Sequence, residues 1–289
     1  MAIENFIPQI WSARVEAQIK AALVYGQPAI VNRNYEGEIK GPGDTVRINT
    51  IGSVSVGRYT RYTDISAAEQ IWDVSQVLTI DQEMYFNFKV DDVDRLQAMG
   101  NVMDAALAEA SYALAFEADK YLANLMTTNV ATKNVIGSIA SPKAVGFDSG
   151  DTNPYNLLVD LSVKLNESNV PMQGRWVVVP PWFHGQLLKD ERFVSFGTGE
   201  NTTRLLNGTV GQAAGFTIMI SNTVPREADG SAYRILCGNN TATTFAEQIN
   251  KVEAYRIQQQ FGDAVKGLHI YGAKVLRPDQ LALVYASAS

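Results

Sequence analysis

Few residues of this chain are of a type that performs catalysis or binds metal. The sequence holds two histidines, His184 and His269, and one cysteine, Cys237. A lone cysteine cannot form an intrachain disulfide or a multi-cysteine zinc or iron–sulfur site. All three residues stand among apolar neighbours, where a buried and unreactive side chain is the usual state. We therefore interpret them as structural and expect no catalytic residue, no bound metal and no cofactor.

Two segments contain part of a known ligand-binding loop motif, but each lacks a residue that the motif requires. Gly262 and Gly267 have the spacing of a phosphate-binding loop, but Leu268 follows where that loop needs a lysine. A calcium-binding loop counted from Asp148 reaches Val159 at its twelfth position, where an EF-hand has glutamate. A tight turn explains the first segment better, and a loop followed by a helix cap explains the second, so the sequence predicts a protein that is not an enzyme.

Composition places the chain among acidic globular proteins. Of its 289 residues, 46% are hydrophobic and 19% are charged, which allows a sizeable buried core. The 24 basic and 30 acidic residues give a net charge of -6, which argues against a protein that grips nucleic acid through its phosphates. No apolar run approaches the ~20 residues of a membrane helix, and the first residues lack the layout of a signal peptide. We expect a soluble protein of a reducing compartment, with no membrane partner.

The N-terminal segment, residues 1–43, does not have the pattern of an ordinary domain start. Its apolar cluster of Phe6, Ile7 and Trp11 comes before any recognisable core element. Exposed apolar side chains need cover, and the cover is either the core of the same chain or a neighbouring subunit. We expect the neighbouring subunit.

From Thr45 to Lys89 apolar and polar residues alternate with a period of two. This pattern predicts long antiparallel strands in an extended hairpin or lobe. The lobe also contains residue types that are enriched at protein interfaces. We predict that they contact another subunit: Arg58, Tyr59, Arg61, Tyr62 and Trp72.

A long amphipathic helix is the strongest local signal in the sequence. Between Val93 and Met126 there is no proline, and apolar residues recur at about 3.6 residues, the period of an α-helix. At 1.5 Å per residue this helix is about 50 Å long, which is typical of a structural spine. Asn153 and Pro154 then predict the start of a second helix. Later strands are predicted at residues 175–180, 215–221, 232–238, 251–258, 268–276 and 281–286.

The order of arm, lobe, spine helix, mixed domain and closing strands is accompanied by several distinctive stretches. They are NFIPQIWSARVEAQI in the arm, KGPGDTVRI at the entry to the lobe, VVVPPWFHGQLLKDERF, and FGDAVKGLHIYGAKVLRPDQLALVYA near the end. Together they resemble the major capsid proteins of tailed phages, which share the Hong Kong 97 fold. The resemblance implies an α+β fold with an N-arm (1–43), an extended β-hairpin E-loop (44–90), a P-domain with the spine helix (91–150), an A-domain (151–262) and a C-terminal return into the P-domain (263–289).

The same resemblance implies a structural role. The expected protein self-assembles, as hexamers and pentamers, into the icosahedral shell around the double-stranded DNA of a bacteriophage, which it encloses without sequence-specific binding. Its implied partners are copies of itself, a scaffolding protein, a portal and, as a further candidate, a decoration protein. Its implied location is the virion, after assembly in the host cytoplasm. Two alternatives stay open: an encapsulin-type compartment shell, which encloses cargo enzymes, and an unrelated α/β enzyme.

Two departures from the family pattern change what is expected. Some members weld their shell through an isopeptide bond from an E-loop lysine, but no lysine occurs between Val46 and Phe88. Some members begin with a long scaffolding segment, whereas here the N-arm starts at Met1. We therefore expect a non-covalent shell and either a separate scaffolding protein or none.

Overall fold

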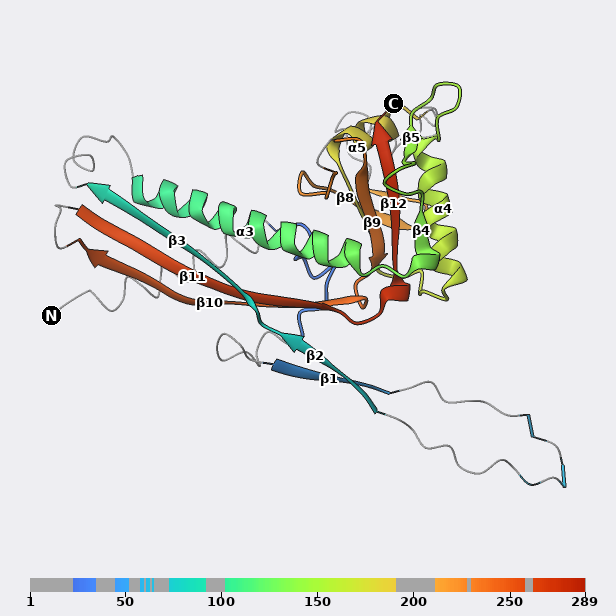
Figure 1. The fold of residues 1–289 in the computed structure, drawn as a ribbon, viewed down its shortest axis with the longest axis horizontal. Coiled ribbons are helices and arrows are strands. Elements are labelled where there is room, and N and C mark those ends of the chain that lie inside the picture. The colour runs from blue at the N-terminus through green and yellow to red at the C-terminus, as the bar shows by residue number, and fades with distance from the viewer. Residues whose placement is uncertain are drawn as a thin grey trace, which may run out of the picture.

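The computed structural model of the chain describes residues 23–34, 45–51, 58–59, 61–62, 64, 73–91, 102–190, 211–227, 230–257 and 262–288. Four of the predicted contact residues lie outside these ranges: Phe6, Ile7, Trp11 and Trp72. The described helices and strands form an elongated body along one long helix and a compact body around a seven-stranded sheet (Figure 1). This mixture of helix and sheet agrees with the predicted α+β class.

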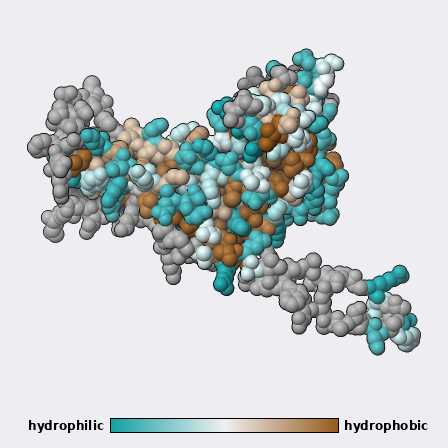
Figure 2. All heavy atoms as spheres, viewed as in Figure 1, coloured by the Kyte–Doolittle hydropathy of each residue, from teal (hydrophilic) through white to brown (hydrophobic). Residues whose placement is uncertain are grey.

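The long helix α3, Val102–Thr128, is the spine of the elongated body. Its buried side chains recur at the predicted helical spacing and include Leu107, Leu114, Ala118, Leu122 and Met126. The predicted first turns of this helix, before Val102, fall outside the described residues. On its exposed face, apolar residues interrupt the hydrophilic surface along α3 (Figure 2). No helix in the described ranges is long and apolar enough to cross a membrane.

A three-stranded antiparallel sheet lies against α3. Met84, Phe86 and Phe88 alternate with exposed residues along one strand, so all three lie on the same face of the sheet. They pack against the core that includes the buried side chains of α3. Gly267 lies opposite Phe86, and a Cβ at this glycine would come within 2.4 Å of the ring. The glycine therefore leaves room for the ring that closes the sheet onto the helix. In spatial order the strands are β10 (Thr243–Arg256), β11 (Gly262–Val275) and β3 (Gln82–Asp91).

The predicted hairpin begins with two paired strands, β1 (Thr45–Ile51) and β2 (Asp73–Thr79). Strand β3 differs from the expectation, because it follows β2 in the chain but pairs with β11 in the sheet beside α3. Its apolar face is the reason, since that face completes the cover of the spine helix. A small core holds the base of the hairpin against the opposite face of the sheet and consists of Val46, Ile48, Leu78, Ile80, Ala246 and Ile270.

The compact body is built on a mixed seven-stranded sheet with a core of its own. Its strands, in spatial order, are β4 (Val135–Ile136), β12 (Leu281–Ala288), β9 (Tyr233–Asn239), β6 (Arg175–Val179), β8 (Phe216–Ile220) and β7 (Gln212–Ala213), with β5 (Lys143–Val145) also paired to β12. The helices of this body are α4 (Pro154–Glu167) and α5 (Pro181–Leu188), and single 3-10 turns lie at Thr132–Asn134 and Pro278–Gln280.

The start of α4 confirms a cap that the sequence predicts. Asn153 accepts hydrogen bonds through Oδ1 from the backbone N–H of Tyr155 at 2.9 Å and of Asn156 at 3.4 Å, and Pro154 occupies the first helical position.

The later strands also lie where they were expected, except that two of them begin earlier. Strand β10 begins at Thr243, before the predicted strand over 251–258, and β11 begins at Gly262, before the predicted strand over 268–276. The prediction of a tight turn between Gly262 and Gly267 is therefore wrong, because this segment pairs with β3 as part of β11.

Candidate functional site

The three residues singled out as possible chemistry lie in structural positions. Cys237 is fully buried in β9, where burial raises the pKa of its thiol far above the usual range. His184 is 8% exposed in α5, and burial lowers its pKa. His269 is fully buried in β11. Among the residues that the structure describes, no group of three or more histidine, cysteine or acidic side chains could hold a metal ion.

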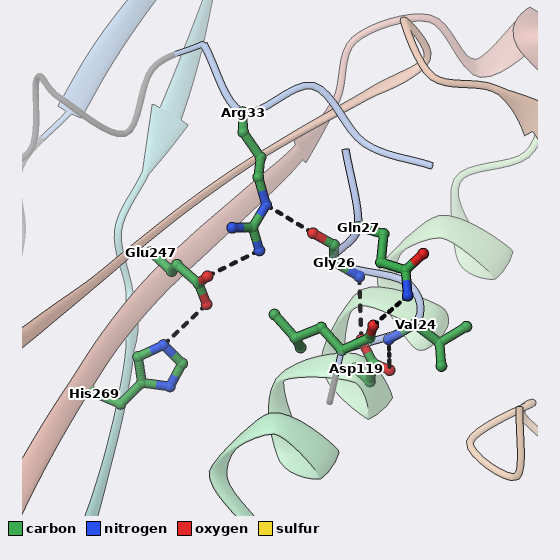
Figure 3. A network of polar contacts seen from close by, with 8 residues as sticks. Val24, Gly26, Gln27, Arg33, Asp119, Glu247 and His269 are labelled. Atoms are coloured by element: carbon green, nitrogen blue, oxygen red, sulfur yellow. Dashed lines mark hydrogen bonds and ion pairs between the residues drawn. The ribbon is translucent and has the colours of Figure 1, made fainter. Parts of the chain in front are cut away.

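A buried polar network holds residues 23–34 between the spine helix and the sheet, and we call it the clasp (Figure 3). On the helix side, the Asp119 carboxylate accepts hydrogen bonds from the backbone N–H of Val24 at 2.6 Å and of Gly26 at 3.1 Å. On the sheet side, the backbone N–H of Asn32 donates to the carbonyl of Thr243, and the backbone N–H of Phe245 donates to the carbonyl of Asn32, at 2.9 Å each. The main-chain groups of residues 23–34 are therefore hydrogen-bonded to the spine helix on one side and to the sheet on the other.

Charged side chains complete the clasp. Arg33 donates from Nε to the carbonyl of Gly26 at 2.7 Å, and its guanidinium lies 2.8 Å from the Glu247 carboxylate. The other oxygen of Glu247 lies 3.2 Å from Nε2 of His269 (Figure 3). The network thus runs from α3, through residues 23–34, to strands β10 and β11 of the sheet.

The two acids of the clasp have opposite electrostatic surroundings. Burial raises the pKa of Asp119 to about 6, although the backbone N–H groups that it accepts lower it in part. Burial alone would also raise the pKa of Glu247, but the hydrogen bond with His269 and the charge of Arg33 hold it below its ordinary value. Glu247 is therefore a paired anion, whereas Asp119 is an anion satisfied only by backbone dipoles.

The sequence did not predict the clasp. No spacing in the sequence relates residues 23–34 to positions 119, 247 and 269. One signal was available: Asp119 stands beside Ala118 and three residues before Leu122, on the face of the helix that is otherwise apolar. An acid at such a position needs hydrogen-bond donors from elsewhere in the chain.

The described residues of the predicted contact set lie together at the end of the hairpin, which points away from both bodies (Figure 1). Tyr59 is 70% exposed and Tyr62 is 101% exposed, while Arg58 and Arg61 are also exposed. Tyr62 has a φ of 66°, an uncommon backbone conformation for an aromatic residue. We call Arg58, Tyr59, Arg61 and Tyr62 the hairpin tip.

A groove lies between the exposed side of α3 and the compact body. Its volume is about 660 Å³, and its lining includes Phe116 and Lys120 of α3, Trp182 of α5 and Arg226. A smaller hollow of about 160 Å³ continues it, because both are lined by Phe116 and by residues 221–223. The hollow adds Tyr112 and Ile220 to the lining. We call the two together the α3 groove.

Comparisons with known proteins relate the whole fold to viral shells. A family model described as phage capsid protein matches residues 53–285. A chain from Mycobacterium phage Che8 is 29% identical, with a TM-score of 0.68 over 90% of each chain. The capsid structure of the cyanophage P-SCSP1u is 20% identical, with a TM-score of 0.64 over 87% of this chain and 85% of that one.

A virus-like particle from Pyrococcus furiosus shares the fold at 13% identity, with a TM-score of 0.54 over 96% of this chain and 99% of that one. The comparison with curated proteins gave no match. The architecture is that of the Hong Kong 97 capsid fold, as the sequence predicts.

Proposed function

The chain belongs to the phage capsid protein family, and on that basis we propose that its copies, arranged as hexamers and pentamers, enclose a phage genome in an icosahedral shell. It is a structural major capsid protein and a component of the virion. The packaged double-stranded DNA is held without sequence-specific binding. The net charge of -6 supports this, because an acidic lining does not hold the phosphates of DNA tightly.

The extent of the family match is the observation that supports the proposal most strongly. The family match extends from residue 53 to residue 285, so it includes the hairpin end, the spine helix and the closing strands in one continuous stretch. A protein that worked as a monomer would have no use for a hairpin whose two tyrosines are 70% and 101% exposed.

The contacts between subunits are proposed to come from the two extended parts of the chain. Phe6, Ile7 and Trp11 of the N-arm pack on a neighbouring subunit. The E-loop acts as a clamp on another neighbour through the hairpin tip and Trp72. The clasp supports both roles, because residues 23–34 lie between the apolar cluster of the N-arm and the hairpin and are bound to the spine helix and to β10.

The domain organisation that we propose follows the family pattern: an N-arm (1–43), an E-loop (44–90), a P-domain (91–150), an A-domain (151–262) and a C-terminal return (263–289). The proposed E-loop includes β3, which pairs with β11 in the sheet beside the spine helix, so the part of the loop outside that sheet is the β1–β2 hairpin. Assembly takes place in the host cytoplasm with a scaffolding protein and a portal. A decoration protein on the outer face is a further candidate partner.

A second function that the fold allows is an encapsulin-type compartment. The likeness to the virus-like particle from Pyrococcus furiosus concerns the fold alone, whereas the phage family model matches by sequence. The material enclosed by the particles distinguishes the two functions, since a phage shell encloses nucleic acid and a compartment encloses protein cargo.

Negative-stain electron microscopy of the purified full-length protein tests the proposal. We expect closed shells, and after expression with a packaging phage we expect them to contain DNA. A protein that stays monomeric at every concentration and with a co-expressed scaffolding protein would contradict the shell. Shells filled with a co-purified enzyme would favour the compartment.

A further inference from the structure

The larger part of the α3 groove has the size and the lining of a small-molecule site. Its volume of about 660 Å³ falls within the range of roughly 300–1,000 Å³ that is usual for ligand pockets. It lies where the C-terminal half of α3 meets the compact body (Figure 1). One wall is a single face of α3, because its residues repeat at every fourth position: Phe116, Lys120 and Asn124. The opposite wall belongs to the compact body and consists of residues 180–182, 221–226 and Tyr233.

Aromatic side chains line both walls. Phe116 is 38% exposed on α3, and across the groove Trp182 packs edge-to-face on Tyr233 with 5.5 Å between ring centroids. Nε1 of Trp182 is shielded from solvent and has no hydrogen-bond partner within the described residues, although a buried indole N–H usually has one. Three prolines complete the opposite wall and restrict its backbone. The groove therefore offers a fixed aromatic surface for a planar ring.

The charges on the two walls are positive. Lys120 stands on the α3 wall and Arg226 on the opposite wall, and no described acid lines this part of the groove. Glu227, the neighbour of Arg226, is paired with Arg234 at 2.6 Å. Glu117 approaches Lys120 only to 3.8 Å, and both side chains are exposed. The groove is therefore a local positive site in a chain of net charge -6, and it favours an anionic ligand.

Side-chain amides supply free hydrogen-bonding groups in the groove. Neither Asn124 nor Asn222 has a side-chain hydrogen bond within the described ranges. The acid of the adjoining hollow, Asp119, is already engaged, because its carboxylate accepts two backbone N–H groups of the clasp. An amide can donate and accept at once, and it pairs in this way with the edge of a nucleobase. The groove thus combines aromatic surface, two cations and amides that can recognise a base.

The lining also gives these groups an order along the groove. Phe116 and Asn222 line both the larger part and the adjoining hollow, so they lie at the end where the two meet. Lys120 and Arg226 line only the larger part. From Phe116 to Lys120 the helix rises about 6 Å, and a single sugar separates the base of a nucleotide from its phosphate. An aromatic end is therefore followed by a cationic end within the reach of one nucleotide.

We propose that the larger part of the α3 groove binds a free mononucleotide. The base lies against Phe116 with its edge toward the amide of Asn222, and the phosphate lies between Lys120 and Arg226. The site belongs to one copy of the chain, so this assignment does not rest on the proposed shell. A bound nucleotide contacts α3 and the compact body at once, and it therefore stabilises the arrangement of the two.

Other ligands satisfy only part of the lining. Inorganic phosphate pairs with the cations but leaves the aromatic surface uncovered, and an uncharged aromatic compound leaves both cations unpaired. A nucleic-acid strand is disfavoured, since a chain of net charge -6 repels a polyanion. An acidic peptide pairs with the cations but has no base edge for Asn222. A nucleotide is the ligand class that uses all three features of the groove.

Calorimetric titration of the full-length, unassembled chain with adenosine 5′-monophosphate (AMP) at low salt tests the site. We expect one AMP per chain. Arg226→Gln and Lys120→Gln should each weaken AMP binding by about tenfold, because each removes a charge-assisted hydrogen bond to the phosphate. Lys143→Gln, at an exposed lysine of β5 that does not line the groove, is the matched control and should bind AMP as the original chain does.

A further variant tests the base end of the site. Phe116→Ala should weaken AMP binding by about tenfold, since stacking on the aromatic ring is lost. It should leave the affinity for ribose 5-phosphate unchanged, whereas a purely structural role of Phe116 would lower both affinities together. Phe116 is outside the three hydrophobic cores, so the unliganded variant should melt at the original temperature, which differential scanning calorimetry measures.

Three results would overturn the assignment. They are no heat of binding at millimolar AMP, equal affinity of the original chain for AMP and ribose 5-phosphate, and unchanged AMP binding in Arg226→Gln and Lys120→Gln. A phosphorylated single-stranded oligonucleotide or a polyglutamate peptide that binds the groove more tightly than AMP would also overturn it, in favour of that ligand class. Because every measurement uses the unassembled chain, none of these results depends on whether shells form.

Discussion

Glu247 and His269 form a hydrogen-bonded pair, 3.2 Å from carboxylate oxygen to Nε2, in the interior of the sheet beside the spine helix. His269 is fully buried, and the Glu247 side chain is 5% exposed. Arg33 reaches the same carboxylate at 2.8 Å from the segment that precedes the hairpin. One acid on β10 thus joins strands β10 and β11 to the segment of chain that lies between the apolar cluster of the N-arm and the hairpin.

The first prediction concerns this acid. Glu247→Ala removes the buried carboxylate that pairs with the Arg33 guanidinium and contacts His269, and breaking a buried ion pair typically costs about 3–5 kcal/mol of unfolding free energy. Urea denaturation of the unassembled full-length chain measures the loss. Glu247→Gln keeps an oxygen acceptor and should lose less. Equal stability of Glu247→Ala and the original chain would show that the pair does not hold the clasp.

The second prediction is a pH dependence that comes from Asp119. Its pKa is about 6 in the folded chain against 3.8 as its ordinary value, so the folded state binds the proton more tightly than the unfolded state. The unfolding free energy should therefore rise as the pH falls from about 7.5 toward 4, by up to about 3 kcal/mol from this group.

Asp119→Asn removes that titration while it keeps one oxygen as an acceptor for the N–H groups of Val24 and Gly26. The stability difference between the original chain and this variant should grow in favour of the original chain on acidification. Because the pKa of Glu247 is below its ordinary value in the folded chain, its protonation at acidic pH lowers the unfolding free energy. This contribution is the same in both proteins and cancels in the difference between them. A difference that is constant with pH would contradict the prediction.

Local patterns predicted the elements, and long-range polar contacts escaped prediction. The buried stripe from Leu107 to Met126 and the Asn153 cap could be read from the sequence, because helical spacing and capping depend on neighbours within a few residues. The partner of β3 and the clasp could not, because they depend on contacts between residues 95 to 214 positions apart. Alternation of apolar and polar residues in a strand such as β3 predicts that one face of the strand is apolar. It does not predict which surface covers that face.

The candidate site divides in the same way. Residue type alone selected Arg58, Tyr59, Arg61 and Tyr62, and the structure places all four on an exposed tip. The α3 groove could not be read from the sequence, because Ile220 and Arg226 reach Phe116 only through the packing of the compact body on α3.

The third prediction concerns the N-arm. Trp11→Ala should weaken assembly while the circular dichroism and melting temperature of the unassembled chain stay unchanged, because the arm is proposed to pack on another subunit. Met172→Ala, at an exposed position elsewhere, is the matched control. Loss of the melting transition in Trp11→Ala would instead place the arm in the core of its own chain.

The fourth prediction is that the shell is held together without covalent links. No lysine occurs between Val46 and Phe88 to supply the nucleophile of an E-loop isopeptide bond. Particles boiled in detergent and reductant should therefore give one band near 31.6 kDa. A ladder of multimers under these conditions would show a cross-link from a residue outside the hairpin.

The last prediction separates the hairpin from the core of the subunit. A short Gly-rich turn in place of residues 53–70 removes the tip but leaves β1, β2 and the small core between them, which includes Val46, Ile48, Leu78 and Ile80. Those buried side chains hold the base of the hairpin on the sheet, so the shortened chain should be soluble and melt close to the original temperature. It should form no particles, as judged by size-exclusion chromatography and electron microscopy, because a contact worth about 1 kcal/mol per subunit is decisive when every subunit of a closed shell must make it. Normal shells from this variant would contradict the clamp, and an insoluble variant would show that residues 53–70 contribute to the fold of the subunit itself.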